Sequence, residues 1–242
     1  MNILVCINQV PDTTSKIRFT DDNKKFDSAG VQHIINPYDE LALSRAVDIE
    51  GAEITVLHVG TADSEASIRK ALAIGAAKAV RVDAEARDAW FVAHQIAKYA
   101  QDKSFDLILF GKESIDFNGS QVPAMVAELL DWPSVSICRK LELEGNTAIV
   151  EREIAGGKET LSVNLPLIIG ATEGIAQVKI PNMRGIMGAR SKPLEVIPAV
   201  EVEALSHIIE YEKPEERGAV TLIDGNNINE LIDLLHNKSK VI

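Results

Sequence analysis

Residues 107–130 read L-I-L-F-G-K-E-S-I-D-F-N-G-S-Q-V-P-A-M-V-A-E-L-L, and they contain the whole unit from which the fold is built. The apolar run Leu107–Phe110 predicts a parallel strand that is covered on both faces. Gly111 ends this strand, a polar loop follows, and residues 121–130 predict a helix. A buried strand followed by a loop and a helix is typical of an α/β sheet.

The same unit recurs on the N-terminal side of this segment. Ile3–Ile7, Ile54–Val59 and Ala79–Val82 predict three further buried strands. The helices expected between them cover residues 37–50, 64–74 and 88–99. The first of these helices has Asn36 as its candidate N-cap and Pro37 at its first position. This alternation predicts a doubly wound, mostly parallel, Rossmann-like sheet of the kind that binds adenine nucleotides.

The pattern changes after Trp132-Pro133. Short alternating segments separated by Gly145 and by Gly156-Gly157 predict a small antiparallel meander at about residues 139–164. Leu167–Gly170 is expected to return to the main sheet. From about Gly174 strong elements become sparse, although a final helix is predicted near 228–235. We therefore expect an α/β domain at 1–182 and an extended C-terminal arm at 196–242 that packs on another subunit; a partly disordered C-terminus is the alternative.

Residues 183–195, M-R-G-I-M-G-A-R-S-K-P-L-E, lie between these two parts. Three large apolar side chains stand here among glycines and cations: Met183, Ile186 and Met187 beside Arg190 and Lys192. Methionine repacks easily, and basic side chains steer acidic surfaces, so this composition suits a loop that recognises protein partners. The alternative, a short amphipathic helix on the body of the protein, fits the apolar spacing equally well.

Composition and charge exclude several classes of protein. The chain has 242 residues and a formal net charge of -11, which argues against non-specific binding of nucleic acid. Its two cysteines, Cys6 and Cys138, are far apart, and no metal-ligand spacing is present. No apolar run is long enough to span a bilayer. The N-terminus reads as a first strand rather than a signal sequence, so we expect a cytoplasmic protein.

Ligands of open α/β sheets bind outside the carboxyl ends of the strands. Four loops should converge there: Asn8–Thr14, Asn36–Asp39, Val59–Thr61 and Gly111–Gln121. Free backbone N–H groups near Gly119–Gln121, together with the helix dipole, would suit a phosphate. Asn118 and Ser120 would instead cap the helix in the alternative interpretation.

The sequence contains no catalytic apparatus to accompany this cleft. It has neither the G-x-G-x-x-G fingerprint nor the G-x-x-x-x-G-K-[ST] phosphate loop. His58 lies in a strand pattern and is expected to be a packed core residue. Asp12, Asp39 and Asp116 stand at loop or helix starts, where they organise loops rather than perform acid–base chemistry. The pattern therefore indicates a nucleotide-binding protein without a catalytic group or a metal site.

Seven sequence pieces resemble the β subunit of electron transfer flavoproteins, in order and over nearly the whole chain. The pieces are V-P-D-T (10–13), N-P-Y-D-E (36–40), I-R-K-A-L-A-I-G-A (68–76), G-K-E-S-I-D-F-N-G-S-Q (111–121), L-D-W-P (130–133), V-E-R-E-I-A-G-G-K-E-T (150–160) and G-I-M-G-A-R-S-K-P-L-E (185–195). The resemblance implies a partner α subunit that holds a redox-active FAD in a mobile domain. It also implies AMP, or in the bifurcating branch a second FAD, in the cleft of this subunit.

The resemblance assigns residues to these roles. Thr13 would lie near the flavin of the α subunit, Met183 would be the apolar anchor for partner dehydrogenases, and Glu153 would belong to the hinge that repositions the flavin domain. The nucleotide would contact Cys6, Asn36, Pro37, Tyr38, Asp39, Val59, Gly111, Ser114, Asp116, Asn118, Gly119, Ser120, Gln121 and Val122.

The implied function is that of an electron-carrier subunit rather than an enzyme. It would accept electrons from flavin-dependent dehydrogenases, such as acyl-CoA dehydrogenases, and pass them to a quinone oxidoreductase or ferredoxin. Phe117-Asn118-Gly119 matches neither the AMP-binding nor the bifurcating type, so the nucleotide and any bifurcation with NADH stay open. The rival class is an ATP-binding or nucleotide-hydrolysing protein of the stress-protein or pyrophosphatase type on the same fold.

Overall fold

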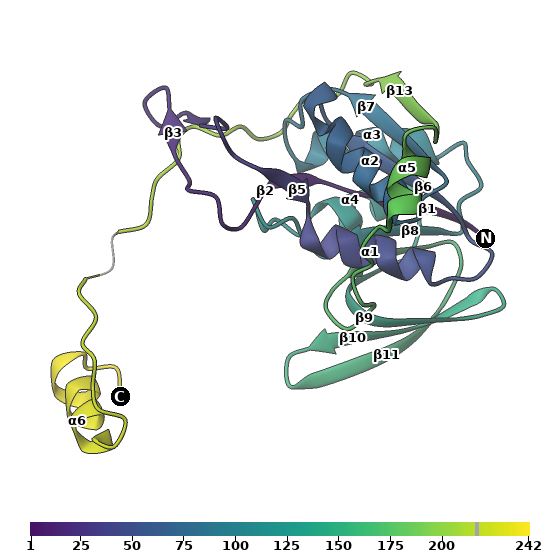
Figure 1. Cartoon of the computed structure of the whole chain (residues 1–242). Helices are drawn as coiled ribbons and strands as arrows, with labels where there is room; N and C mark the ends of the chain where they lie inside the picture. The colour runs from purple at the N-terminus through teal and green to yellow at the C-terminus, as the bar shows by residue number, and fades with distance from the viewer. Residues whose placement is uncertain (216–217) are drawn as a thin grey trace.

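The computed structural model describes residues 1–215 and 218–242. A nine-stranded sheet forms its centre, in the order β11-β10-β9-β12-β8-β1-β6-β7-β13 (Figure 1). The predicted parallel core is confirmed. It consists of β1 (Asn2–Cys6), β6 (Glu53–Val59), β7 (Lys78–Asp83), β8 (Leu107–Gly111) and β12 (Leu167–Ala171).

Helices cover both faces of this parallel core, which is why its strands read as continuous apolar runs. α1 (Pro37–Val47) and α2 (Glu65–Ile74) pack on the face that carries Ile3 and Val5. α3 (Ala89–Ala100) and α4 (Val122–Leu130) pack on the opposite face, which carries Leu4 and Cys6. A single 3₁₀ turn, η1 (Ala62–Ser64), leads into α2.

The antiparallel meander is present and is continuous with the main sheet. It consists of β9 (Ser134–Glu144), β10 (Thr147–Ile154) and β11 (Gly157–Asn164). β9 begins several residues earlier than the alternation suggests. Its first residues pair in parallel with β12, and its later residues pair antiparallel with β10. One long strand therefore joins the nucleotide-binding type of sheet to the meander.

Residues 183–195 form ordered elements instead of one loop. α5 (Met183–Ala189) lies against α2, and β13 (Leu194–Pro198) adds an edge strand parallel to β7. The sequence did not indicate β13, because L-E-V-I-P is short and ends in proline. The first residues of the predicted arm, 196–198, thus belong to the sheet.

Two extensions leave this body (Figure 1). After β1 the chain forms a ribbon of β2 (Gln9–Pro11) and β5 (His33–Ile35), beyond which a small hairpin of β3 (Phe19–Thr20) and β4 (Lys25–Phe26) projects. The C-terminal chain crosses this hairpin, where the rings of Tyr211 and Phe19 stack with their centroids 4.8 Å apart.

The chain ends in a separate helical unit far from the sheet (Figure 1). It contains α6 (Ile228–Asp233) and the short π-helical turn η2 (Leu234–Lys238), which confirms the predicted final helix. Among the described residues, no helix is both long enough and apolar enough to cross a membrane.

Candidate functional site

The strand order reverses between β1 and β8. From β1 the chain proceeds to β6 and β7, then returns to β8 on the other side of β1. The carboxyl ends of these strands lead into the predicted loops that begin at Asn8, Val59 and Gly111. Loops on either side of a reversal diverge, and this leaves the crevice in which ligands of this fold class bind.

Asp39 joins the two strands on either side of the reversal. Its side chain is buried in the first turn of α1, at 6% exposure. Oδ2 accepts a hydrogen bond of 2.7 Å from the backbone N–H of Asn8, which follows β1. Oδ1 accepts another of 2.7 Å from the N–H of Gly111, at the end of β8. One carboxylate therefore fixes the start of a helix to the ends of both strands.

Burial changes the pKa of Asp39. Loss of hydration disfavours the charged carboxylate and raises the pKa of Asp39 to about 7, and the negative charge of Asp116 adds to this increase. The backbone hydrogen bonds from Asn8 and Gly111 and the side-chain hydrogen bond from Asn36 oppose the increase. Burial, followed by the charge of Asp39, raises the pKa of the Cys6 thiol well above its usual value. Cys6 is therefore a neutral, apolar lining of this edge at physiological pH.

Asn36 fastens the loop that follows β8. It occupies the predicted N-cap position of α1, but its side chain makes no capping bond there. Instead Nδ2 donates to the carbonyl of Glu113 at 2.8 Å, and Oδ1 accepts from the N–H of Ile115 at 3.2 Å. Pro37 stands at the first helical position, as the sequence indicated.

The distal part of this loop is exposed and leaves backbone donors free. Asn118 and Ser120 both have positive φ angles, 50° and 52°. α4 begins at Val122 with Gln121 as N-cap, so the alternative in which Asn118 or Ser120 caps the helix is wrong. Within the described residues, the N–H groups of Gly119, Ser120 and Gln121 have no acceptor. Unpaired N–H groups at a helix N-terminus are the donor set that a phosphate requires.

Hydrogen bonds inside the loop hold its shape. Ser114 Oγ donates to Asp116, and the N–H of Asn118 donates to the carbonyl of Ser114 at 2.8 Å. Phe117 lies in the exposed part of the loop and is 68% exposed. An exposed apolar ring makes Phe117 a candidate contact residue.

The remaining nucleotide residues surround the same edge. Val59 is buried at the end of β6, next to β1, and His58 is buried within β6 as predicted. Tyr38 lies under the Lys112 ammonium, with 4.7 Å between Nζ and the ring centroid. Lys112 follows Gly111 directly and brings a cation to this edge, which the sequence motifs did not indicate. Thr13 stands apart, in an exposed turn beyond β2.

A second candidate surface lies on α5. The side chains of Met183 and Met187 are 72% and 69% exposed, and Ile186 is 43% exposed. Asn182 caps the helix by accepting a 2.9 Å bond from the N–H of Gly185. Gly185 also permits close packing, because a Cβ there would lie 2.5 Å from the carbonyl oxygen of Ala73 in α2. The short helix of the alternative interpretation is therefore confirmed, and the recognition of partners by its exposed side chains stays a prediction.

The cations of this segment differ in their environment. Lys192 Nζ donates to the carbonyls of Leu72 and Ala76 at 2.8 and 2.7 Å, where α2 ends. Lys192 therefore fastens α5 to the body. Arg190, by contrast, is exposed at the end of α5.

Glu153 lies on β10 and is half exposed. Arg139 Nη1 donates to Glu153 Oε1 at 2.7 Å, and Arg139 Nε lies 3.6 Å from Glu151. Exposed ion pairs of this kind contribute little to stability. The carboxylate of Glu153 can therefore exchange its partner at low cost.

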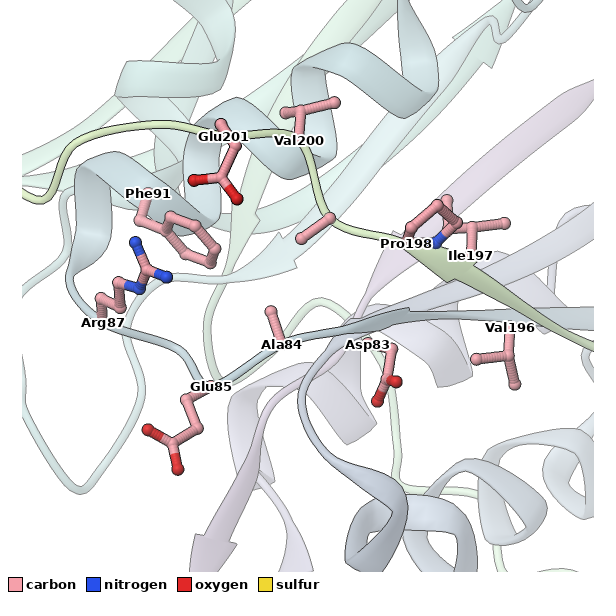
Figure 2. Close-up of a pocket in the computed structure, with 11 residues that line it drawn as sticks. Asp83, Ala84, Glu85, Arg87, Phe91, Val196, Ile197, Pro198, Val200 and Glu201 are labelled. Atoms are coloured by element: carbon pink, nitrogen blue, oxygen red, sulfur yellow. The ribbon is translucent and has the colours of Figure 1, made fainter.

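A cavity of about 490 Å³ lies elsewhere, at the carboxyl ends of β7 and β13 (Figure 2). Arg87 and Phe91 line one side, with the guanidinium 4.9 Å from the ring centroid. The carboxylates of Asp83, Glu85 and Glu201 line it as well. None of the predicted nucleotide residues lines this cavity.

Fold and site together define an α/β protein with a strand reversal at β1 and β8, the place where ligands of this fold class bind. A family model described as "Electron transfer flavoprotein domain" matches residues 24–202. The electron transfer flavoprotein subunit beta of Bacillus subtilis is 34% identical over 259 aligned residues that cover all of both chains. The subunit beta of Sus scrofa is also 34% identical, over 90% of this chain and 91% of its own. The chain belongs to the electron transfer flavoprotein family and matches its β subunits.

Family membership confirms the resemblance carried by the seven sequence pieces. The family consists of electron carriers associated with flavin. The stress-protein and pyrophosphatase alternative is therefore set aside. Among the described residues, no group of three or more metal-ligating side chains is assembled.

Proposed function

We propose that this chain is the non-catalytic subunit of a heterodimeric electron carrier. It accepts electrons from flavin-dependent dehydrogenases, such as acyl-CoA dehydrogenases, and passes them to a quinone oxidoreductase or a ferredoxin. The observation that carries the proposal is the sheet edge at β1 and β8, where Asp39 holds the ends of both strands. Among the described residues of this edge, three consecutive backbone N–H groups are free at the start of α4, in a family of electron carriers.

The nucleotide in this edge is AMP or a second FAD. Its phosphate would accept from the N–H groups of Gly119, Ser120 and Gln121 at the start of α4, with Val122 just behind them. Tyr38, Cys6 and Val59 would offer apolar contacts, and Phe117 would cover the base. The remaining predicted nucleotide residues would affect binding through the backbone whose path they hold. They are Asn36, Pro37, Asp39, Gly111, Ser114, Asp116 and Asn118.

The flavin held mainly by the α subunit supplies the electron-transfer chemistry when it is bound. The residues of this chain bind, orient and release the proteins that carry electrons. Met183, Ile186 and Met187 would anchor a dehydrogenase transiently, with Arg190 steering its acidic surface and Lys192 holding α5 in place. Thr13 would approach the flavin of the α subunit. Residues 199–211 are held against this chain's own body, so the predicted arm on that subunit would be residues 218–242.

Glu153 has the exposure and the weak pairing that a hinge contact requires. We expect it to leave Arg139 and meet a cation of the moving flavin domain. Substitution Glu153→Ala should slow turnover without changing the unfolding midpoint of the subunit. A large loss of thermal stability would instead identify Glu153 as a structural residue.

The nucleotide content of the co-purified α/β heterodimer tests the proposal. Denaturing extraction and chromatography would give one FAD and one AMP per heterodimer for a single-flavin carrier. Two FAD and no AMP would place a redox flavin in this subunit and favour bifurcation. A chain that purifies alone, stable and loaded with ATP, would contradict the electron-transfer role.

A further inference from the structure

We propose that Asp39 is a positioning residue: it shapes the nucleotide edge through the backbone and does not contact the nucleotide itself. The inference rests on the proposed nucleotide function and assigns this residue its part in it. The geometry carries the inference. Both carboxylate oxygens of Asp39 already accept backbone N–H groups at 2.7 Å, one on each side of the strand reversal.

The contact between α1 and β8 is close enough to require this arrangement. A Cβ at Gly111 would lie 2.5 Å from Asp39 Oδ1 and 2.6 Å from Tyr38 Cβ. The glycine thus lets α1 approach the end of β8 until the carboxylate can reach the backbone. Gly111 is also the residue from which the phosphate-facing loop departs, so the path of that loop depends on this contact.

Asn36, three residues before Asp39, also binds the backbone of the loop after β8. Its amide bonds to the backbone of Glu113 and Ile115, which lie two and four residues beyond Gly111. Two buried side chains at the start of α1 therefore hold the proximal loop at three backbone positions. The free donors at Gly119–Gln121 follow directly from the part so held.

The charged form of Asp39 is the one that can accept from both strand ends. A protonated carboxyl group has a hydroxyl donor in place of one acceptor, so it would release Asn8 or Gly111. Its titratable neighbours are Cys6 from β1, Tyr38 and Glu40 from α1, and Lys112, Glu113 and Asp116 from the loop after β8. We call the two hydrogen bonds of Asp39, from the N–H groups of Asn8 and Gly111, the brace. Because the pKa of Asp39 is raised to about 7, acidification through neutral pH loosens this brace.

Asp39→Asn would change the affinity for AMP in two opposite ways, through the lost charge and through the lost hydrogen bond. A buried negative charge repels a phosphate, so Asp39→Asn would strengthen the binding of AMP if charge alone mattered. Loss of the brace would weaken binding, because an asparagine amide has a single acceptor oxygen and its NH2 group only donates. One lost buried hydrogen bond corresponds to about a tenfold weaker Kd. The brace shapes the loop that receives the phosphate, so it predicts a smaller loss for adenosine, which lacks the phosphate.

The experiment uses the full chain co-purified with its α subunit and stripped of nucleotide. AMP and adenosine affinities are measured by calorimetry at pH 8 for the wild type, Asp39→Asn and the exposed control Asp102→Asn. Amide exchange of residues 107–121 is measured from pH 6 to pH 8 and corrected for the intrinsic rate. We expect about tenfold weaker binding of AMP, and a smaller loss of adenosine affinity, by Asp39→Asn only. We also expect a protection step near pH 7 in the wild type that this variant lacks.

Binding of AMP by Asp39→Asn as tight as, or tighter than, that of the wild type would overturn the positioning role. A wild type without the exchange step near pH 7 would overturn it too, and this readout does not depend on whether the variant folds. A wild type that binds neither AMP nor adenosine nor FAD would contradict the proposed nucleotide function, and the positioning role with it. The two failures are therefore distinguishable.

Discussion

At the scale of single residues, the start of α1 shows how a polar group is made tolerable in a core. Asp39 is buried, and its carboxylate receives the N–H groups of Asn8 and Gly111. These bonds offset part of the desolvation cost of the charge, and the pKa of about 7 shows that they do not offset all of it. The ionised carboxylate is thus retained at the expense of stability.

This cost predicts a pH dependence of stability with a definite sign. The folded-state pKa of Asp39 is raised from 3.8 to about 7. Between these values the folded protein holds a proton that the unfolded chain has lost, so stability falls as the pH rises. The free energy of unfolding should fall by up to about 1.4 kcal/mol per pH unit from this group. Urea titrations from pH 4.5 to 8 should show this slope in the wild type and a shallower one in Asp39→Asn. Equal slopes would contradict the assignment.

Gly111 provides a second residue-scale test. Substitution Gly111→Ala would place a methyl group against Asp39 and Tyr38, and we expect a loss of about 2 kcal/mol from this overpacking. Gly119→Ala, in the same loop, is the matched control, because nothing lies within 4 Å of a Cβ there. Urea unfolding monitored by circular dichroism compares the two. Similar stabilities of both variants would show that the contact at Gly111 relaxes freely.

At the scale of elements, the sequence predicted the parallel strands and their helices well. Leu107–Phe110 and Ile54–Val59 are long apolar runs, and a strand buried on both faces requires such a run. β13 escaped prediction because L-E-V-I-P is short and ends in proline, and β2 and β5 because three residues carry no period. The loop ends of the site were predicted from topology. The bonds of Asp39 and Asn36 were not, since they depend on tertiary contacts.

α5 carries a prediction about docking. Met183 is the most exposed apolar side chain of the helix, so Met183→Ala should lower the rate of electron transfer at limiting dehydrogenase by about tenfold. The rate at saturating dehydrogenase and the flavin content should change little, since only the encounter is weakened. Val196→Ala, an exposed apolar site on β13, is the control. Equal loss at limiting and saturating partner would contradict docking through Met183.

The attachment of α5 is testable separately from docking. Lys192 donates to two carbonyls at the end of α2, and Lys192→Met retains the stem but removes both bonds. We expect a loss of about 1–2 kcal/mol and faster amide exchange confined to residues 183–192. Lys98→Met, an exposed lysine in the last turn of α3, should change neither. Unchanged exchange in Lys192→Met would show that packing of Gly185 and Ala189 suffices to hold the helix.

At the scale of the whole molecule, one globular body carries a C-terminal chain that is fastened at separate points. Gln95 exchanges two hydrogen bonds with the backbone of Val200, and Asp88 accepts from the N–H groups of Leu205 and Ser206. Tyr211 then stacks on Phe19 of the projecting hairpin. Contacts within this subunit therefore determine the path of the C-terminal chain as far as Tyr211. The helical unit of α6 and η2 lies away from the sheet (Figure 1).

That distal unit presents apolar side chains to solvent. Ile228, Leu231 and Ile232 of α6 are exposed, and the contacts of α6 among the described residues are mainly with η2. A helix this apolar is stable in water only when another surface covers it, and the proposed α subunit is the occupant that family membership supplies. Deletion of residues 218–242 should leave the unfolding midpoint of the isolated body within about 2 °C of the full chain.

The same deletion should weaken association with the α subunit by about 100-fold or more, because several buried apolar side chains at about 1–2 kcal/mol each would be lost. Analytical ultracentrifugation of the co-purified pair measures this change directly. Tyr211→Ala distinguishes the contribution of the chain before residue 211 from that of α6, because it removes the contact with Phe19 and leaves α6 intact. If α6 supplies the affinity, this variant retains most of the association. An unchanged association after deletion would assign the interface to the sheet body instead.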